Sequence, residues 1–524
     1  MSSVQVADLK EIRVKTPGFG GGLNIRDAED QVAPDELRRA ENVVYDAKGG
    51  VAKRLGTRSQ GTFGASSELA ISTYTFYRPG AGNPQVMLHT NAGKLYYTND
   101  PTASPVVWTL IIGGLSTTVP CAFETQNSKC WLCEGTVYAA WDGTTYTTYP
   151  GAPPMNFLCT WKDTMWGASF ANPDRVYSSA AGDPSSWPAL NYVDILHGDG
   201  DRIMGINSDG LFLIVGKRKR IQVIYDPSLF ANRTADYEKG VESHFSFVHM
   251  EDKLYYLSRL GVCWWQGDTS ARLISYKIDP LFRPELLNLG ALGSTWAYQL
   301  NDRCGWAVAE VGSSVPTLII EYYPRLGPIY QISGNIGPGP WTMHRMPVST
   351  FCTYRLGSIE QLFGGHPTTN KFMWVFSPDG TDDGATFSST VQSASMDFGD
   401  PVNWKYFRRI KLVGRGSFKM CLRRNFQNSD YYCKTVTLTT PSDLWDSADD
   451  LFGIGLWGSS SPPLHEFMFG TDVYGRVFSI YITDTNTTTT TFPVPVGSVD
   501  RNVTLGQWAL LEATFDGFLI GLRD

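Results

Sequence analysis

Short stretches of alternating apolar, aromatic and polar residues, separated by turns, recur along most of the chain. In DRVYSSAAGDPSSWPAL, from Asp174 to Leu190, a strand-like Arg-Val-Tyr leads through small residues and a Gly-Asp-Pro turn to Trp187. Each such unit has an aromatic strand, a turn rich in Gly, Asp, Asn or Pro, and a second aromatic or apolar strand. Related units begin at Gly93, Gly135, Lys219, Asp252, Thr317 and Lys371.

Degenerate units of about four strands, repeated every 30 to 60 residues or roughly so, predict a β-propeller. One four-stranded blade cannot bury its own faces, so blades arranged around an axis must cover one another. In this interpretation Asp174–Leu190 forms the outer hairpin of a blade. Pro184 fixes the shape of its turn and Trp187 covers the blade. A stack of separate β-sandwiches predicts similar local patterns and is the alternative.

The pattern changes near residue 388, where longer alternating strands begin, as in TVQSASMDFGDPVNWKYFRRIKLVGRG. This change predicts a second β-domain with a sandwich-like fold. The predicted fold is therefore mainly β, with an N-terminal arm over residues 1–60, a β-propeller over 61–387 and a β-sandwich-like domain over 388–524. The threonines from Thr487 to Thr491 fit an exposed loop or an edge strand.

One helix is predicted, within the N-terminal arm, from Ala33 to Val44 (APDELRRAENVV). Pro34 suits the first turn of a helix, where its missing N–H costs no hydrogen bond. Leu37, Ala40 and Val44 would share one face. Long helical patterns are otherwise nearly absent.

The composition agrees with a folded, strand-rich protein. Of 524 residues, 42% are hydrophobic, 18% are charged and 13% are aromatic, and 52 glycines supply turns. No run of about 18 apolar residues predicts a membrane span. The N-terminus lacks the apolar core of a secretory signal, so we expect synthesis in a cytosol. Nine cysteines, an odd number, fit reduced thiols better than a disulfide framework.

Cysteines and histidines do not form a pattern with zinc-site spacing. Cys130 and Cys133 form a single CxxC with Cys121 upstream, and in a strand their sulfurs would face opposite sides, as core thiols do. His244 and His249, five residues apart in a strand-like stretch, are likewise expected on opposite faces.

Four other short motifs could carry chemistry, and each has a simpler structural explanation. HGDGD, from His197 to Asp201, offers cation ligands but lacks the length of a calcium loop, so a surface turn is expected. GKRKR, whose basic residues are Lys217 to Arg220, is expected to be a solvated hairpin turn rather than a phosphate-binding site. GFGGG, from Gly18 to Gly22, lacks phosphate-loop spacing. TDDGATF, from Thr381 to Phe387, falls one residue short of a glycosidase Asp box.

We therefore predict no catalytic, cofactor-binding or metal-binding residues, and no enzymatic activity. Carboxylates from distant blades could still meet in the fold, which sequence spacing does not reveal.

Ordered motifs at both ends and in the middle of the chain carry a resemblance. From Gly18 to Arg58 the order is G-G-L-N, R-D, P-x-E, A-x-N-V and K-R-x-G, at Gly21–Asn24, Arg26–Asp27, Pro34–Glu36, Ala40–Val43 and Lys53–Gly56. D-R-V-Y and G-D-P-x-x-W-P follow within Asp174–Pro188. The chain ends with W-x-L-x-E-x-x-F-D-G at Trp508–Gly517 and then Gly521-Leu522-Arg523. In this order the motifs resemble the tail hub, or tail nozzle, proteins of short-tailed (podovirus-type) bacteriophages.

The resemblance implies a structural virion protein that contains a β-propeller. Such proteins form a ring, expected here to be a hexamer, at the distal tail beneath the portal and its adaptor. They continue the DNA ejection channel and retain the packaged genome. The implied partners are further copies of the chain, the tail adaptor (head–tail connector) protein, and tail needle, plug or fibre proteins. Double-stranded DNA would pass transiently without specific binding. The implied location is the virion, after synthesis in the host cytoplasm.

A carbohydrate-binding or glycan-cleaving propeller, such as a receptor-binding tail component, is the alternative, since exposed Trp and Tyr can stack on sugars. The charge is compatible with a DNA channel. The chain has a formal net charge of −7, so six copies carry 6 × −7 = −42. A channel wall rich in Lys and Arg would hold a polyanion by its phosphates. We therefore expect a neutral or negative wall, with the GKRKR turn outside it or at a subunit contact.

Overall fold

The computed structural model describes residues 10–15, 18–46, 49–78, 82–250, 252–265, 267, 270–326, 339–438, 465–484 and 509–520. These residues form two compact units. The propeller unit comprises Thr57–Glu321 and Arg345–Ser377, and the terminal unit comprises Met1–Gly56, Tyr322–His344 and Pro378–Asp524. Thr487–Thr491, Trp508 and Gly521–Arg523 lie outside the described residues.

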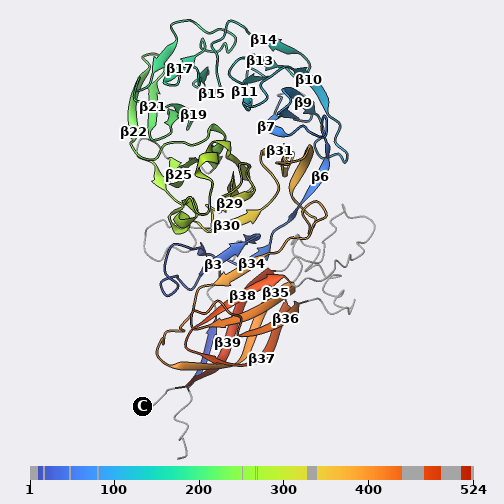
Figure 1. Ribbon diagram of the computed structural model, residues 1–524, viewed down its shortest axis with the longest axis vertical. Helices are drawn as coiled ribbons and strands as arrows, with labels where there is room; N and C mark the ends of the chain where they lie inside the picture. The colour runs from blue at the N-terminus through green and yellow to red at the C-terminus, as the bar shows by residue number, and fades with distance from the viewer. Residues whose placement is uncertain are drawn as a thin grey trace, which may run out of the picture. The chain divides into compact units, whose positions relative to one another are not determined.

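Six four-stranded sheets of the propeller unit are arranged as blades that follow one another around a circle (Figure 1). Five of them use strands that are consecutive in the sequence. Their strands are β7 (Ala70–Phe76), β8 (Gln85–Thr90), β9 (Lys94–Thr98) and β10 (Thr109–Gly113); β11 (Ala122–Gln126), β12 (Lys129–Cys133), β13 (Tyr138–Trp141) and β14 (Tyr146–Thr148); β15 (Phe157–Trp161), β16 (Thr164–Ala168), β17 (Arg175–Ser178) and β18 (Tyr192–Asp194); β19 (Ile203–Ser208), β20 (Leu213–Lys217), β21 (Ile221–Asp226) and β22 (Ala231–Asp236); β23 (Val248–Met250), β24 (Lys253–Ser258), β25 (Gly261–Trp265) and β26 (Arg272–Leu273).

The sixth blade closes the circle. It joins β31 (Cys352–Leu356), β32 (Ile359–Gly365) and β33 (Lys371–Ser377) to β6 (Gly56–Thr62), which is distant in the sequence. Between the fifth and sixth blades lie β27 (Trp296–Leu300), β28 (Arg303–Val308) and β29 (Leu318–Tyr322), and β27 contacts both β23 and β31. The predicted mainly-β fold with a propeller is therefore confirmed.

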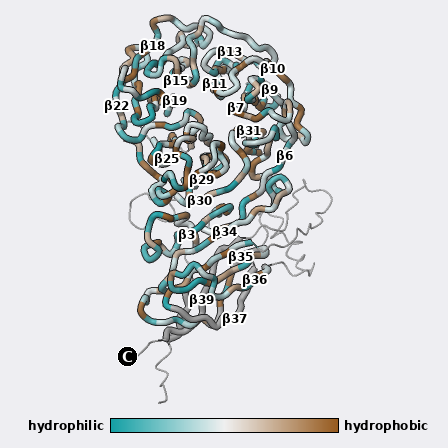
Figure 2. The backbone as a smooth tube through the Cα atoms, in the orientation of Figure 1, coloured by the Kyte–Doolittle hydropathy of each residue, from teal (hydrophilic) through white to brown (hydrophobic). Residues whose placement is uncertain are grey.

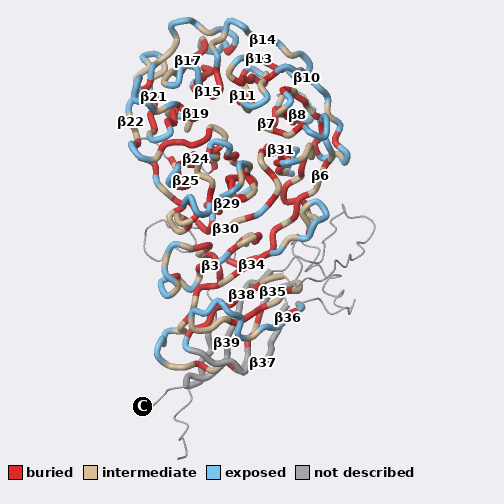
Figure 3. The backbone as a smooth tube through the Cα atoms, in the orientation of Figure 1, coloured by how far each residue is buried: buried red, intermediate tan, exposed pale blue. Residues whose placement is uncertain are grey.

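The cores of the propeller lie between neighbouring blades, as the aromatic repeats predict. One cluster joins Phe76 and Met87 of the first blade to Phe123 and Trp141 of the second. Hydrophobic stretches are distributed around the whole ring, and exposed residues lie on its periphery (Figures 2 and 3). Each blade thus supplies one face to each of two cores, which is why no blade is stable by itself.

The stretch from Asp174 to Leu190 contains β17, whose next blade strand is β18, the outermost of that sheet. The Trp187 ring packs edge-on against Tyr138 of the preceding blade, with ring centroids 5.4 Å apart. Its Nε1 donates to the carbonyl of Pro184, and the Tyr138 hydroxyl donates to the same carbonyl. The predicted strand and the covering tryptophan are confirmed, but the predicted hairpin within this stretch is wrong, because its second strand, β18, begins only at Tyr192.

The terminal unit is built on a large additional sheet. Its strand order is β30-β3-β34-β38-β35-β39-β5-β4, with β2 beside β3, β1 beside β39, and β36 and β37 beside β35. The strands are β1 (Lys10–Lys15), β2 (Gly22–Leu23), β3 (Glu36–Glu41), β4 (Val43–Tyr45), β5 (Val51–Lys53), β30 (Trp341–Arg345), β34 (Thr390–Ser393), β35 (Trp404–Arg424), β36 (Tyr432–Leu438), β37 (His465–Gly475), β38 (Phe478–Asp484) and β39 (Ala509–Ile520). These units divide the chain differently from the expected ranges 1–60, 61–387 and 388–524, because the N-terminal strands pair with C-terminal ones.

The predicted helix at Ala33–Val44 is wrong. Residues Glu36–Glu41 form strand β3, which pairs antiparallel with β34 and parallel with β2. The chain then turns at Asn42, whose φ is +56°, into β4. Helix propensity is a weak preference, and the long-range pairing partners of this segment outweigh it.

The helices of the described residues are three short 3₁₀ helices: η1 (His244–Ser246), η2 (Tyr276–Phe282) and η3 (Leu289–Ser294). None of the helices in this part of the chain has the length and hydrophobicity needed to cross a membrane.

Candidate functional sites

The K-R-x-G motif supplies a fully buried charge to the terminal unit. Arg54 is fully buried, and its guanidinium donates to both carboxylate oxygens of Asp382 at 2.8 and 2.5 Å and to Asn42 Oδ1 at 3.0 Å. The guanidinium also lies over the Phe387 ring, 3.7 Å from its centroid. Neighbouring Lys53 pairs with Asp484 at 3.0 Å. The TDDGATF segment therefore holds an arginine with its Asp382 carboxylate, which is a structural role.

The G-G-L-N, R-D and P-x-E motifs meet in a second polar cluster. Asn24 Nδ2 donates to Asp27 at 2.8 Å and to Glu36 Oε2 at 2.7 Å. Glu36 also accepts from the N–H of Ala33, and Arg38 donates to the Asp27 carbonyl at 2.7 Å. The cluster ties the loop before β3 to the strand itself.

Two motif glycines are required by close backbone approach. A Cβ on Gly56 would collide with the carbonyl oxygens of Thr381 and Asp379, beside the Arg54–Asp382 pair. Gly22 has a φ of +73° and lies against the backbone of Pro340. The glycine at position 22 of the GFGGG segment thus allows close backbone packing.

The GKRKR and HGDGD motifs form one ionic cluster in the propeller unit. Lys217 is fully buried at the end of β20, and its Nζ lies 2.9 Å from Asp174 and 2.6 Å from Asp199. The backbone N–H groups of Arg218 and Lys219 donate to Asp201. The predicted hairpin turn is confirmed, but a solvated turn is wrong for Lys217, because two carboxylates draw it inward.

Asp174 belongs to the D-R-V-Y motif, so this motif contributes a carboxylate that pairs with the buried Lys217. Burial raises the pKa of Asp174, but hydrogen bonds from the Gly198 N–H and from Lys217 outweigh that effect, so the net shift of this pKa is downward. Arg175 forms an ion pair with Asp194 across strands β17 and β18 at 2.7 Å. HGDGD is the expected surface turn, with its carboxylates engaged by the GKRKR turn.

The described cysteines other than Cys421 and Cys433 are buried. Cys130 and Cys133, on β12, belong to two different hydrophobic clusters, so the predicted opposite orientation of their sulfurs is confirmed. Burial raises the pKa of both thiols, so they stay protonated at neutral pH.

The expectation of reduced thiols is wrong for Cys421 and Cys433. They face each other in register on β35 and β36 and form a disulfide. Asp430 lies near both sulfurs, and these three residues are the group of potential metal ligands within the described residues. Because both sulfurs are used in the disulfide, neither is a thiolate ligand.

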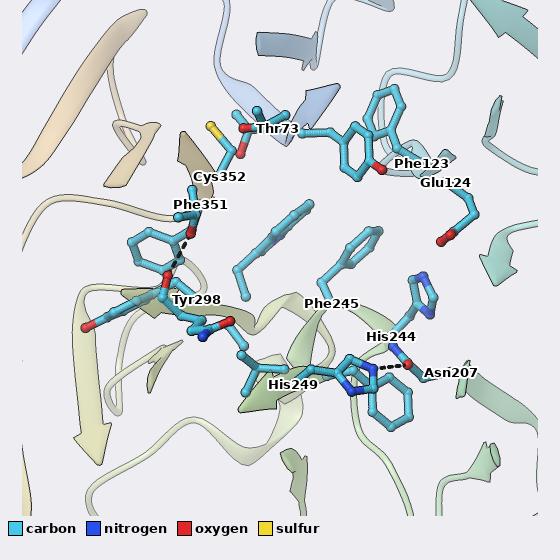
Figure 4. A pocket seen from close by; sticks show the side chains of 18 of the residues that line it. Thr73, Phe123, Glu124, Asn207, His244, Phe245, His249, Tyr298, Phe351 and Cys352 are labelled. Atoms are coloured by element: carbon cyan, nitrogen blue, oxygen red, sulfur yellow. Dashed lines mark hydrogen bonds between the residues drawn. The ribbon is translucent and has the colours of Figure 1, made fainter. Parts of the chain in front are cut away.

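A cavity of about 640 Å³ lies at the propeller axis, lined by strands from every part of the circle (Figure 4). Glu124 of β11, Asn207 of β19, His249 of β23 and Tyr298 of β27 line it, with Cys352 of β31. His249 Nε2 is 2.8 Å from Asn207 Oδ1. Sequence analysis did not identify this site, because its lining residues come from separate strands that are far apart in the sequence.

His244 and His249 both line this cavity, so the prediction of opposite faces is wrong. The 3₁₀ helix η1 contains His244, and strand alternation therefore does not extend to His249. Burial lowers the pKa of His244 to about 4, against a hydrogen bond to the backbone of Ile206, and burial also lowers the pKa of His249, against the charge of Asp209. Both imidazoles are neutral at pH 7.

Glu124 differs from the other acidic residues of the propeller discussed above. Burial raises its pKa to about 7, and hydrogen bonds from Thr160 only partly oppose this. The carboxyl is thus close to half-ionised at neutral pH. Glu124 could therefore exchange a proton or bind a cation. The disulfide has no ionisable group, and the carboxylates of the ion-paired clusters already have cationic partners.

The fold and these sites define a mainly-β protein with a β-propeller and an additional β unit. No model of a protein family matches the chain, and no curated protein matches it in sequence. Among solved structures, the chain is similar to Raptor of Chaetomium thermophilum, at 13% identity over 66% of this chain and a TM-score of 0.39. It is also similar to BBS1N, solved in complex with ARL6DN, at 9% identity over 65% of this chain and 98% of that one, with a TM-score of 0.40. The chain spans 30% of the Raptor chain.

Proposed function

We propose that this protein is a structural subunit of the tail of a short-tailed bacteriophage. In this proposal it forms a hexameric ring at the distal tail, continues the DNA channel below the portal and adaptor, and helps to retain the genome. The proposal rests on the resemblance of the ordered motifs to tail hub proteins. The observation that carries it is that the motif residues of the N-terminal stretch have specific structural roles.

Those roles fall into two buried polar clusters of the terminal unit. Arg54 binds Asp382 and Asn42, and Asn24 binds Glu36. A buried guanidinium or carboxylate requires a particular partner in a particular place, because a buried charge without one is strongly destabilising. The motif is therefore a signature of this unit, which supports common ancestry with proteins that share the motif.

The proposed partners are further copies of the chain, the adaptor protein, and a needle, plug or fibre protein. A heterologous contact whose rotation closes generates such a ring. In this proposal the N-terminal segment is a candidate for docking onto a neighbouring subunit or onto the ring above. Its strands β3 and β5 pair within the terminal unit, and β6 supplies a blade strand. Deletion of residues 1–56 would therefore remove part of the fold and would not test docking alone.

Negative-stain electron microscopy of the purified chain, alone and mixed with the portal–adaptor assembly of its phage, tests the proposal. We expect closed rings of six 58.1 kDa subunits, and attachment of one ring to the adaptor end. A chain that stays monomeric under both conditions would contradict it.

A second measurement tests the electrostatics of the channel. Assembled rings should not retain duplex DNA at physiological salt, because a channel wall without repeated basic side chains does not bind the DNA phosphates. Tight binding of duplex DNA would show that the expected neutral or negative wall is wrong. A glycan array on the same preparation tests the carbohydrate-binding alternative.

A further inference from the structure

The cavity at the propeller axis has the size of a small-molecule site. Its volume of about 640 Å³ falls within the range of known ligand pockets. It lies wholly within the propeller unit, since its lining residues run from Thr73 to Thr353 outside the terminal unit. The rigid strands of several blades therefore fix its walls, and no loop has to close to form it.

Aromatic rings make up much of the wall. Tyr74 stacks on Phe123 with centroids 5.4 Å apart and an interplanar angle of 15°. Phe245 stacks on Trp296 at 4.1 Å and 12°. Figure 4 shows Phe245 projecting into the cavity, with Glu124 and His244 beside the same space. Ring faces carry partial negative charge, so they attract cations placed over them.

The charged groups of the wall favour the same kind of ligand. Glu124 is the one carboxylate that lines the cavity, and no lysine or arginine lines it among the described residues. No ion pair within the described part of the chain includes Glu124, whose hydrogen-bonding partner is the neutral Thr160. Some buried carboxylates of the same unit have cationic partners, as Glu321 has Arg303 at 3.4 Å. A carboxylate among ring faces, with no protein cation beside it, is complementary to a cation from outside.

We propose that this cavity binds a small organic cation with an ammonium group, held by the Glu124 carboxylate and the surrounding aromatic faces. The neutral imidazoles of His244 and His249 do not repel such a ligand. An anionic ligand would meet no positive side chain in the wall. This inference is independent of the proposed role in the virion, because it concerns the inside of one propeller.

Choline and its uncharged isostere 3,3-dimethylbutan-1-ol are a matched pair of probes, since they differ only in the quaternary nitrogen. Titrations of the full chain at pH 8, followed by calorimetry or by ligand NMR, should show choline binding at least tenfold more tightly than the alcohol. Glu124→Gln keeps the shape of the side chain and removes the charge, so it should weaken choline binding about tenfold, which corresponds to about 1.4 kcal/mol. It should leave binding of the alcohol unchanged.

Glu238→Gln, at an exposed position outside the cavity, is the control and should leave choline binding as it is. Cooperative melting of both variants, at a temperature no lower than that of the parent protein, shows that the fold persists. Equal affinity for choline and the alcohol, or no binding of either, would overturn the proposal. Preferential binding of a neutral sugar such as methyl glucoside would overturn it in favour of a carbohydrate site. Ring assembly is measured separately, so either proposal can fail without the other.

Discussion

The propeller unit and the terminal unit are both built of strands, but different interactions hold those strands together. Between blades, aromatic and aliphatic side chains form repeated apolar layers, in which Trp161, Trp166 and Trp265 are almost fully buried. In the terminal unit, buried charged and amide groups connect segments hundreds of residues apart, as Arg54 and Asp382 do. The first kind of contact tolerates exchange among residues of similar volume, and the second does not.

This difference explains which sequence signals were strong. Many combinations of apolar side chains can fill the layers between blades. The sequence of the propeller therefore shows only an irregular recurrence of aromatic residues and turns. A buried guanidinium needs a carboxylate at one particular position, as Arg54 needs Asp382. Where two backbone segments lie in close contact, as at Gly56, only glycine fits. Residues of that kind produce the short ordered motifs, and most of those motifs map to the terminal unit. Lys217 with Asp174 is the propeller's counterpart.

The largest expected effect is the loss of the arginine in the terminal unit. Arg54→Ala should lower the free energy of unfolding by about 3–5 kcal/mol, because Asp382 is left buried without its cation. Arg39→Ala is the control, since the Arg39–Glu41 pair involves an arginine side chain that is 49% exposed; its loss should cost less than about 1 kcal/mol. Thermal unfolding with hydrogen exchange resolved by unit measures both. Equal losses in the two variants would contradict the contrast between buried and exposed pairs.

Lys217→Met extends the comparison into the propeller. We expect a smaller loss, about 1–3 kcal/mol, because Asp174 keeps the N–H of Gly198 and Asp199 keeps Arg220, whose guanidinium lies 3.8 Å away. The lowered pKa of Asp174 means that its stabilising contribution is lost as the pH falls through that pKa. The difference between parent and variant should therefore shrink in acid. Lys219→Met, at an exposed position in the same turn, should change nothing measurable.

The thiols test the apolar layers of the propeller. Cys130→Ser and Cys133→Ser should each lower the free energy of unfolding by about 1–2 kcal/mol, because a hydroxyl in an apolar cluster lacks a partner. The two effects should add, since the residues belong to separate clusters. Cys130→Ala, which adds no polar group, is the control and should cost less. Stoichiometric zinc in the purified protein, lost in these variants, would show instead that the thiols bind metal.

Features that depend on residues close together in the sequence were mostly predicted correctly, whereas several features that depend on residues far apart in the sequence were not. The strand that precedes Trp187 and the orientations of Cys130 and Cys133 follow from local alternation, and both were predicted. The strand β3 was predicted as a helix, because its partner β34 lies about 350 residues further along the chain. The disulfide of Cys421 with Cys433 depends on the register of β35 and β36. The axial cavity gathers residues from separate blades, so only the closed ring reveals it.

The smallest expected effect concerns the one carboxyl that faces the cavity without a cation. In the folded protein the pKa of Glu124 is raised to about 7 from the ordinary 4.5, so the folded chain holds this proton more tightly than the unfolded chain does. Stability should therefore fall as the pH rises from about 4.5 to 7 and remain lower above that. Full burial would make the fall about 3 kcal/mol, but the side chain borders an open cavity, and we expect about 1 kcal/mol.

Glu124→Gln cannot ionise, so it should match the parent protein at pH 4.5 and exceed its stability at pH 8. Melting temperatures across this range measure the difference, and Glu238→Gln, at an exposed position, should follow the parent throughout. Choline at saturating concentration should reverse the order at pH 8, because it binds the parent about tenfold more tightly and therefore stabilises the parent by about 1.4 kcal/mol more than the variant. If the two proteins keep the same stability at every pH, the carboxyl is already well solvated or paired. In that case Glu124 would not be an unpaired buried charge. The propeller would then be stabilised by apolar layers between blades, and the terminal unit by buried charge pairs, without a charged site at the propeller axis.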